Sequence, residues 1–236
     1  MRDDPPPARR ISVVLPVLDE ELRIGDRLEE LGRTAGIAEV IVVDGGSRDR
    51  TAEITRSFPD VRLVSAARGR GSQMNAGARV ASGDVLLFLH ADVALPPDAA
   101  TWVERVLADP AVVAGAFRTW TVADAGRSWV APLLHLADLR SRFTQLPYGD
   151  QALFVRRDVF DGVGGFPDQP LMEDLELSLR LRRVGRIATA PATVRVSGRR
   201  FLARPIRSAV QMRLFPLLYR LGVPPRVLAR LYGNPR

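Results

Sequence analysis

The 236-residue chain contains no cysteine and no lysine. Without cysteine it can form neither disulfides nor thiolate metal sites, so a bound metal would need carboxylate, imidazole, carbonyl or water ligands. No run of about 18 uninterrupted apolar residues occurs, which argues against a transmembrane helix. The first ten residues, MRDDPPPARR, lack the apolar core of a secretory signal peptide and are expected to form a disordered tail. These absences fit a reducing compartment, and we expect a cytoplasmic protein.

Acidic residues are absent from the last quarter of the chain. Every Asp and Glu lies at or before Glu176, whereas 14 of the 34 arginines follow it, and the formal net charge is +7. Such a basic region could attract a nucleotide diphosphate, an anionic lipid or nucleic acid, or it could simply reflect an arginine-rich composition. Only 6% of residues are aromatic and no recognition motif for nucleic acid is present, so no nucleic-acid partner is expected.

Apolar strand patterns alternate with helical patterns in the first half of the chain. Strands are expected at residues 11–15, 40–43, 61–64 and 85–89, and helices at 20–32, 51–57 and 72–80. This order predicts an α/β fold with a Rossmann-like, mostly parallel central sheet and helices on both faces. Ligands of such sheets bind beyond the carboxyl ends of the strands, so the polar residues that follow each strand are candidates for a site.

The second half continues with further strands and helices and ends in a basic segment. We expect helices at 97–107, 128–143 and 173–184, and strands at 112–121 and 152–155. Residues 205–236 form amphipathic helices in which apolar residues such as Val210 and Leu214 alternate with arginines. This pattern fits contact with an anionic membrane surface, and it equally fits packing on the domain itself or on a second subunit in a homodimer.

Two motifs are candidates for nucleotide binding. Asp44 and Gly45 directly follow the strand at 40–43, where the carboxylate could accept hydrogen bonds from a base or ribose and the glycine would admit a ligand close to the backbone. Alternatively, Asp44 caps the next helix. In the loop RGRGSQMNAG (68–77), Arg70, Gly71 and Asn75 stand at a helix start, which together with arginine forms an anion site. A plain loop with a solvated arginine is the alternative.

Two further motifs are candidates for metal binding and catalysis. His90 and Asp92 follow the strand at 85–89 two residues apart, so both could address one metal ion. Glu173 and Asp174 lie at a helix start, where a carboxylate close to another has a raised pKa that suits a general base. Acids also favour helix N-termini without any catalytic role.

In this order the motifs resemble family 2 glycosyltransferases of the GT-A fold, over residues 11–201. SVVLPVLDEE, with Pro16, Leu18 and Glu20, resembles the opening strand and loop of the family, and VVDGGSRDRT resembles its nucleotide-binding turn. LHAD falls where the family has a metal-binding Asp-x-Asp motif. GDQALFVRR, with Asp150 and Gln151, and GGFPDQPLMEDLELSLRLRRVG resemble its acceptor half. RGRGSQMNAGA together with LHAD further resembles a bacterial subgroup described as glycosyltransferases of arsenosugar biosynthesis or as associated with radical-SAM and selenium-domain proteins.

The resemblance implies an inverting transfer of a sugar from a nucleotide diphosphate sugar to an acceptor hydroxyl. It assigns nucleotide-sugar binding to Pro16, Leu18, Glu20, Asp44, Gly45, Arg70, Gly71, Asn75, His90, Ala91, Asp150, Gln151, Arg199 and Arg200. Asp92 and His90 would hold a divalent cation, Mn²⁺ or Mg²⁺, and His90 in place of an acid favours Mn²⁺. Asp174 would be the general base, with Glu173 as the nearest rival.

The expected organisation is a single catalytic domain, 11–204, with a nucleotide-sugar half at 11–93 and an acceptor half at 94–204, followed by the helices of 205–236. Leu18 stands where many relatives have an aromatic residue that stacks on the base, so the base is left open. The acceptor is a small molecule or a lipid-linked compound, and a lipid acceptor would place the protein at the inner face of the membrane. A nucleotidyltransferase and a catalytically silent nucleotide-sugar-binding module are the alternative functions.

Overall fold

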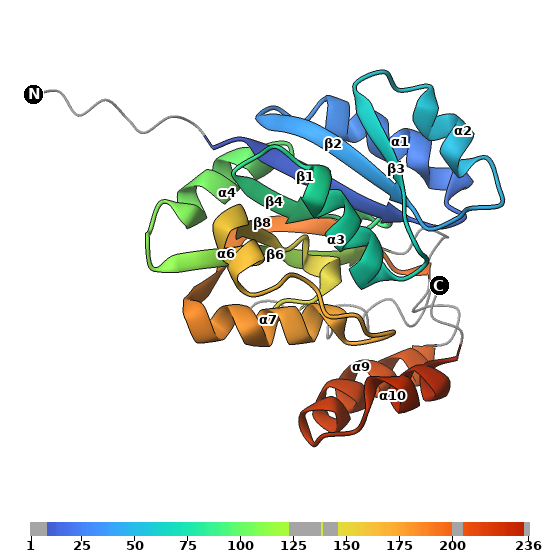
Figure 1. Cartoon of the computed structure of the whole chain (residues 1–236), viewed down its shortest axis with the longest axis vertical. Coiled ribbons are helices and arrows are strands. Elements are labelled where there is room, and N and C mark those ends of the chain that lie inside the picture. The colour runs from blue at the N-terminus through green and yellow to red at the C-terminus, as the bar shows by residue number, and fades with distance from the viewer. Residues whose placement is uncertain (1–8, 123–137, 139–145, 200–204, 234–236) are drawn as a thin grey trace, which may run out of the picture.

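The computed structural model describes residues 9–122, 138, 146–199 and 205–233. The helix expected at 128–143 therefore lies outside the described residues apart from Asp138, as does Arg200. Figure 1 shows a central sheet with helices on both faces, which confirms the α/β fold class. The described strands form one eight-stranded sheet in the order β3-β2-β1-β4-β7-β6-β8-β5.

The nucleotide side of the sheet is built from consecutive βα units. Its strands are β1 (Ile11–Val17), β2 (Ile37–Asp44), β3 (Val61–Ser65) and β4 (Val85–Phe88), and its helices are α1 (Glu21–Gly32), α2 (Thr51–Arg56) and α3 (Arg70–Val80). These four strands are adjacent in the order β3-β2-β1-β4 and run parallel to one another, as predicted. Val17 pairs with Asp44, so the loops that follow β1 and β2 leave the same edge of the sheet.

The rest of the sheet is mixed. Its elements are β5 (Val93–Ala94), α4 (Ala99–Leu107), β6 (Val112–Val122), the 3-10 turn η1 (Gly149–Gln151), β7 (Phe154–Arg156), α6 (Arg157–Gly162), α7 (Glu173–Val184) and β8 (Arg186–Ser197). β7 runs antiparallel to both β4 and β6, and β5 runs antiparallel to β8. An apolar pattern locates a strand but does not give its direction, which explains why these antiparallel pairs were not predicted.

β8 is a long strand that was not predicted from the sequence. Its residues RIATAPATVRVS form no apolar run, and only Ile187, Ala190 and Val194 are buried. The strand exists because it pairs with β6 along most of its length, with Trp120 opposite Arg195. Pairing with a distant strand, rather than local preference, therefore decides the conformation of this segment.

Two apolar layers hold the sheet between its helices. Along β1, Val13 and Leu15 face the layer that includes Ile24 of α1 and Val103 of α4. Val14 faces the opposite layer, which includes Met74 of α3. Gly77 of α3 permits this packing, because a Cβ there would lie 2.4 Å from Val14 Cγ1. These layers fix the positions of the loops at the carboxyl edge.

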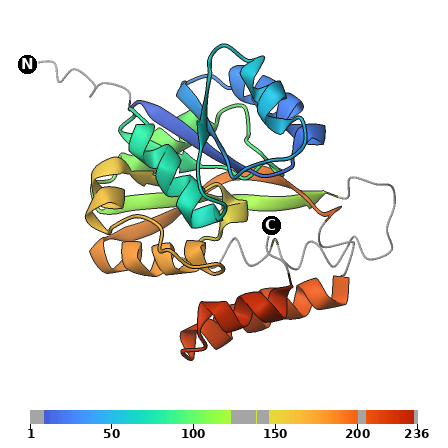
Figure 2. The same ribbon diagram turned by 45° about the vertical axis from the view of Figure 1, so that its right-hand side comes forward.

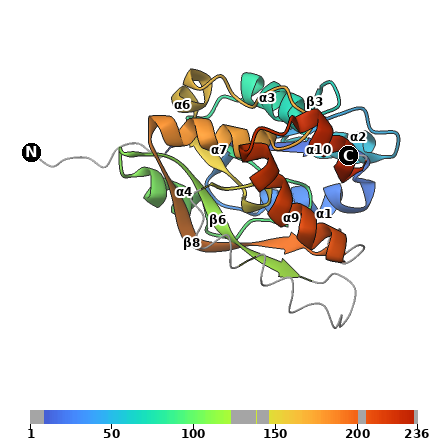
Figure 3. The same ribbon diagram turned by 90° about the horizontal axis from the view of Figure 1, so that it is seen from below.

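The helices α9 (Pro205–Arg220) and α10 (Pro225–Tyr232) lie beneath α7, on the side away from α1 and α2 (Figures 1 and 2). Seen from below, α9 crosses under the region where α7 begins (Figure 3). A small third core joins the pair to the domain through Phe215, Leu228 and Leu171. Of the alternatives for residues 205–236, packing on the domain is thus realised for one face of α9. Among the described residues, none of the helices combines the length and the hydrophobicity that a membrane-spanning helix requires.

Candidate active site

A cavity of about 290 Å³ opens at the carboxyl edge of the sheet. Its lining comes from the loop after β4, the start of α3, the turn at η1, the start of α7 and the inner face of α9. A narrow pocket of about 40 Å³ adjoins it and is lined by Pro16, Val17, Leu18, Glu20, Gln73 and Ala91. Arg70, His90 and Asp92 line both spaces. Of the predicted site residues, Arg70 of α3 and the LHAD motif therefore connect the residues at the end of β1 with Glu173 and Asp174 of α7.

The carboxyl pair at the start of α7, Glu173 and Asp174, lines the larger cavity. Glu173 is buried, and its Oε1 lies 3.7 Å from Arg70 Nη1. The backbone N–H of Gly149 donates to Asp174 Oδ2 at 3.1 Å. Burial, followed by the charge of Glu173, raises the pKa of Asp174 to about 8, against the lowering effect of Arg70 and of the Gly149 hydrogen bond. Asp174 is thus a carboxyl group that can accept and release a proton near neutral pH.

Gly149 brings the metal-ligand candidate His90 close to Asp174. A Cβ at this position would lie 2.3 Å from His90 Cε1 and 2.5 Å from Asp174 Oδ2. No other residue would fit without displacing one of these two side chains. The glycine therefore lets His90, in the loop after β4, and Asp174 of α7 line the same cavity although they are 84 positions apart in sequence.

Arg70 is a cation of the cavity. Its burial opposes the charge, but the nearby carboxylates of Glu173, Asp174 and Asp92 more than offset this effect and raise the pKa of the guanidinium. Arg70 therefore stays charged, as an anion-binding role requires.

The turn after β2 is held together by its own hydrogen bonds. Asp44 Oδ1 accepts from Ser47 N at 2.9 Å and from Ser47 Oγ at 2.5 Å. Gly45 lies against the Gln73 side chain, whose Nε2 donates to Val17 O and Val43 O, both at 2.8 Å. Neither Asp44 nor Gly45 is among the residues that line the two cavities. Asp44 therefore holds the turn through Ser47 and does not cap α2, which begins only at Thr51. Its binding role stays a prediction.

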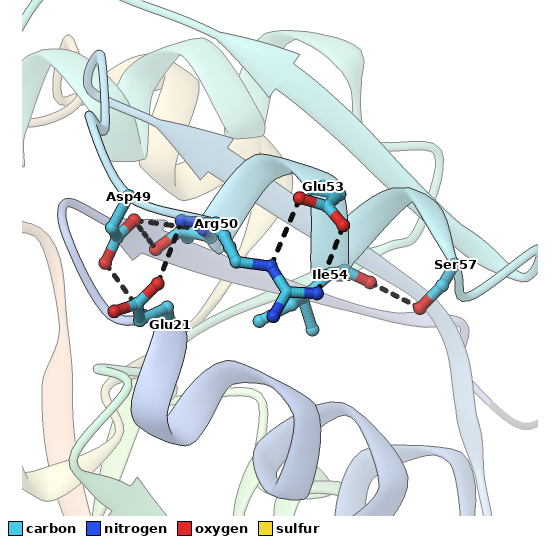
Figure 4. Close-up of polar contacts among 7 residues, drawn as sticks. Glu21, Asp49, Arg50, Glu53, Ile54 and Ser57 are labelled. Atoms are coloured by element: carbon cyan, nitrogen blue, oxygen red, sulfur yellow. Dashed lines mark hydrogen bonds and ion pairs between the residues drawn. The ribbon is translucent and has the colours of Figure 1, made fainter.

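The loop after Ser47 ties α1 to α2 (Figure 4). Asp49 accepts hydrogen bonds from Glu21 N at 3.1 Å, Thr51 N at 3.0 Å and Thr51 Oγ1 at 2.5 Å. In return, Arg50 N donates to Glu21 Oε2 at 3.1 Å, and the Arg50 guanidinium pairs with Glu53. This network satisfies backbone donors at two helix starts and fixes the loops beside the narrow pocket.

Other residues that were predicted to bind the nucleotide form hydrogen bonds and close contacts between the segments around the cavity. The Asn75 amide exchanges two hydrogen bonds of 2.9 Å with the backbone of Phe166, and a Cβ on Gly71 would lie 2.9 Å from Pro167 O, so both residues join α3 to the segment before α7. Gln151 is buried and bonds to Phe117 O and Tyr148 N, each at 3.2 Å. Asp150 lines the cavity.

Arg199 is exposed and is not among the cavity-lining residues. Its predicted partner Arg200 lies outside the described residues. Their role in binding a diphosphate stays a prediction.

Asp92 and His90 could hold a cation only together with further ligands, such as phosphate oxygens of a substrate and water. In the described part of the chain, no group of three or more His, Asp or Glu side chains is arranged to hold a metal ion. Mg²⁺ and similar ions, however, often take one or two protein ligands and complete their shell with substrate phosphates and water. Two donors beside Arg70 at the junction of the cavities match that arrangement.

Several cavity residues were not predicted from the sequence: Thr119, Thr121, Asp138, Tyr148, Met212, Phe215 and Tyr232. Asp138 accepts from Thr121 N at 2.9 Å and from Thr121 Oγ1 at 2.8 Å, a contact between distant positions that no local pattern reveals. For Met212 and Phe215, the spacing of Ser208, Met212 and Phe215 along one helix face was the available signal.

The chain is similar to proteins of known function. At 29% identity over 174 residues, covering 67% of this chain and 50% of the relative, it resembles the undecaprenyl-phosphate 4-deoxy-4-formamido-L-arabinose transferase of Pseudomonas aeruginosa (strain LESB58). The chain thus spans about half the length of the curated relatives it matches.

Solved structures share the fold. The mannosyltransferase PcManGT from Pyrobaculum calidifontis, in complex with GDP-Man and Mn²⁺, superposes with a TM-score of 0.63 at 25% identity, over 79% of this chain and 56% of that one. Glucosyl-3-phosphoglycerate synthase from Mycobacterium tuberculosis, in complex with Mn²⁺, UDP and glucosyl-3-phosphoglycerate, gives 0.57 at 22% identity, over 80% of this chain and 70% of that one. The GT-A fold is thereby confirmed.

The family assignment agrees with this fold. Residues 12–164, which include β1, the Asp44 turn, the LHAD motif and Gly149, match the family described as Glycosyl transferase family 2. The chain belongs to glycosyl transferase family 2.

Proposed function

We propose that the protein is an inverting glycosyltransferase that moves a sugar from a nucleotide diphosphate sugar to an acceptor hydroxyl. The observation that carries the proposal is the close approach of Asp174 and His90 at Gly149, in a cavity that Arg70 and Asp92 also line. His90, Arg70 and Asp92 line the adjoining pocket as well. The donor would lie with its nucleotide towards Pro16, Leu18 and Glu20, and its sugar would reach the larger cavity.

In the reaction, the Asp174 carboxylate takes the proton of the acceptor hydroxyl. The hydroxyl oxygen then forms a bond to the anomeric carbon from the face opposite the diphosphate, while the bond between this carbon and the diphosphate oxygen breaks. The nucleoside diphosphate leaves with the bonding electron pair, and the configuration at the anomeric carbon inverts. A single base is enough for this displacement, and no enzyme nucleophile is needed.

Asp92 and His90 would hold the divalent cation, Mn²⁺ or Mg²⁺, together with oxygen atoms of the donor diphosphate. Such a cation stabilises the charge that develops on the leaving diphosphate. Arg70 adds a fixed positive charge on the same side. The Mn²⁺ and the GDP-Man or UDP in the structures of similar fold support this part of the proposal.

The similar proteins also bear on the identity of the acceptor and on the location of the protein in the cell. The Pseudomonas relative is named for undecaprenyl phosphate, which supports a lipid-linked acceptor and contact with the inner face of a membrane. A small-molecule acceptor, and a homodimer through the C-terminal helices, are the alternatives. The subgroup of arsenosugar biosynthesis also stays a prediction, since the relatives carry other names.

A donor screen tests the proposal. Nucleotide sugars are added with and without Mn²⁺, and the donor that binds the folded protein raises its melting temperature. With this donor, Asp174→Asn is expected to lower the rate of sugar transfer by about 10²–10⁴-fold, the usual contribution of a general base, and to leave the melting shift in place. Glu173→Gln serves as the comparison for the rival base. Release of pyrophosphate from a nucleoside triphosphate would instead indicate a nucleotidyltransferase, and unchanged function in Asp174→Asn would indicate a binding module.

A further inference from the structure

Gln73 is a buried amide that lines the narrow pocket. It lies near the start of α3 and is 4% exposed. Its Nε2 donates to the carbonyl oxygens of Val17 and Val43, both at 2.8 Å, at the carboxyl ends of β1 and β2. The side chain therefore joins these two strand ends beside the pocket.

These two hydrogen bonds fix which way round the amide lies. A carbonyl oxygen only accepts hydrogen bonds, so the NH2 group of Gln73, and not its oxygen, must face Val17 and Val43. Both N–H donors of the amide are used in these contacts. The group that Gln73 can offer to a ligand in the pocket is thus its carbonyl oxygen, Oε1, which only accepts.

Gly45 sets the position of this amide. A Cβ on Gly45 would lie 3.0 Å from Cδ, Nε2 and Oε1 of Gln73, closer than such atoms normally approach. The backbone of the turn after β2 therefore packs against the amide, and rotation of the side chain would break both bonds to the strand ends. Gln73 Oε1 is accordingly a rigid acceptor.

Arg70 lies three positions before Gln73 on the same helix and also lines the narrow pocket. Residues three apart are neighbours on a helix surface. The guanidinium of Arg70 attracts the oxygens of a diphosphate, whereas the amide oxygen of Gln73 repels them and accepts from hydroxyl or N–H groups. In a nucleotide these two kinds of group are also neighbours, because the ribose with its hydroxyl groups is bonded directly to the phosphates.

We propose that Gln73 is a specificity-determining residue of the donor site, and that its Oε1 accepts a hydrogen bond from the nucleoside, either from a ribose hydroxyl or from an N–H group of the base. The diphosphate would then lie at Arg70. A buried acceptor discriminates against a ligand that lacks the matching donor, because it loses its contact with water and gains no hydrogen bond in return. This inference rests on the proposed function and names a residue that selects the donor.

Nucleotide analogues test the inference, once the melting screen has identified a donor. The full chain receives Mn²⁺ and the nucleoside diphosphate of that donor, its 2′-deoxy form, its 3′-deoxy form, or a form with a methyl group on the hydrogen-bonding N–H of the base. Calorimetry gives the Kd of each compound. We expect one analogue to bind the wild type at least about tenfold more weakly than the parent compound, and this analogue identifies the group that donates to Gln73.

A pair of variants separates this contact from general effects. Gln73→Met keeps the approximate length of the side chain and removes the amide. The same analogue is then expected to bind within about twofold of the parent compound, because the variant offers no acceptor to either one. Arg79→Met introduces the same residue at an exposed position of α3 outside both cavities, and should preserve the tenfold preference. Comparing two ligands within one protein cancels any general loss of affinity.

A variant of the turn gives a second measurement if Gln73→Met does not fold. Gly45→Ala keeps the amide but displaces it, and is expected to reduce the preference for the parent compound at least about threefold. The inference is overturned if the wild type binds all three analogues as tightly as the parent, or if the preference persists undiminished in the variant that folds. The proposed function fails earlier and separately, if no nucleotide sugar shifts the melting temperature.

Discussion

At the scale of single residues, the site depends on Asp174, a carboxyl group whose burial opposes its ionisation. The pKa of Asp174 is raised to about 8, so the folded protein prefers this group protonated at a pH where the unfolded chain ionises it. The stability that the neutral group contributes is complete below the ordinary pKa of an aspartate. It is lost as the pH rises towards 8. Ionisation of Asp174, which its role as a general base requires, therefore lowers the free energy of unfolding.

Asp174→Asn is thus expected to stabilise the protein at high pH. The variant carries no charge at this position, so its melting temperature should exceed that of the wild type at pH 9, by roughly 2–4 °C for each kcal/mol of relieved charge burial. The difference should shrink as the pH falls to 5. Thermal unfolding of both proteins between pH 5 and pH 9 measures this, and a difference independent of pH would contradict the pKa shift.

At the scale of elements, α1 and α2 share one carboxylate at their starts. Partial burial opposes the charge of Asp49, but hydrogen bonds from Thr51 and Glu21 outweigh it and lower its pKa. Neither helix has a side-chain hydrogen bond from its own N-cap residue, so this contact replaces ordinary caps.

Asp49→Ala is expected to cost about 1 kcal/mol in the free energy of unfolding, the usual effect of losing a helix cap. Because the pKa is lowered on folding, the contribution of Asp49 is present at neutral pH and is lost as the pH falls through the folded pKa. Denaturant unfolding at pH 7 and pH 3 measures both effects. Asp60→Ala, which removes an exposed acid at the turn before β3, is the matched control and should change little.

At the scale of the whole molecule, the outer face of α9 and α10 is both apolar and basic. Val210, Leu214 and Leu217 of α9, and Leu221 directly after it, follow one another at helical spacing and are 41–72% exposed. The arginines at 213, 220, 226 and 230 of the same two helices are also exposed. Exposed apolar residues among cations suit an anionic lipid surface, to which each arginine contributes about 1 kcal/mol.

We therefore expect the protein to float with vesicles that contain phosphatidylglycerol and to stay unbound with pure phosphatidylcholine. Leu217→Asp should weaken this binding at least about tenfold, because it places an acid within the apolar stripe. Leu22→Asp, at an 82% exposed position on α1, should leave it unchanged. If both variants bind the vesicles as the wild type does, the apolar stripe does not contact the membrane. A second subunit would then be the better explanation of the stripe, and the molar mass of the protein in solution would test this.

The sequence by itself determined the βα order, the strand ends and the approximate place of the acidic and glycine motifs. Apolar runs such as VVLP and VVDG are local signals, and a parallel sheet sends their carboxyl ends to one edge. It also suggested one face of α9 through helical spacing. These features depend on residues close to one another in the chain.

Only the tertiary structure decided which polar residues line the cavity and which ones join the segments around it. Asp44, Gly71 and Asn75 look like ligands in sequence, yet they form contacts with Ser47, Pro167 and Phe166. Conversely, Gly149 and Phe215 enter the site through contacts with residues many positions away. The direction of β7 and the existence of β8 have the same origin. A hydrogen bond or close contact between distant segments produces no periodic pattern in the sequence of either segment. The local pattern therefore predicts which edge of the sheet carries the site, whereas tertiary packing decides which residues line the cavity.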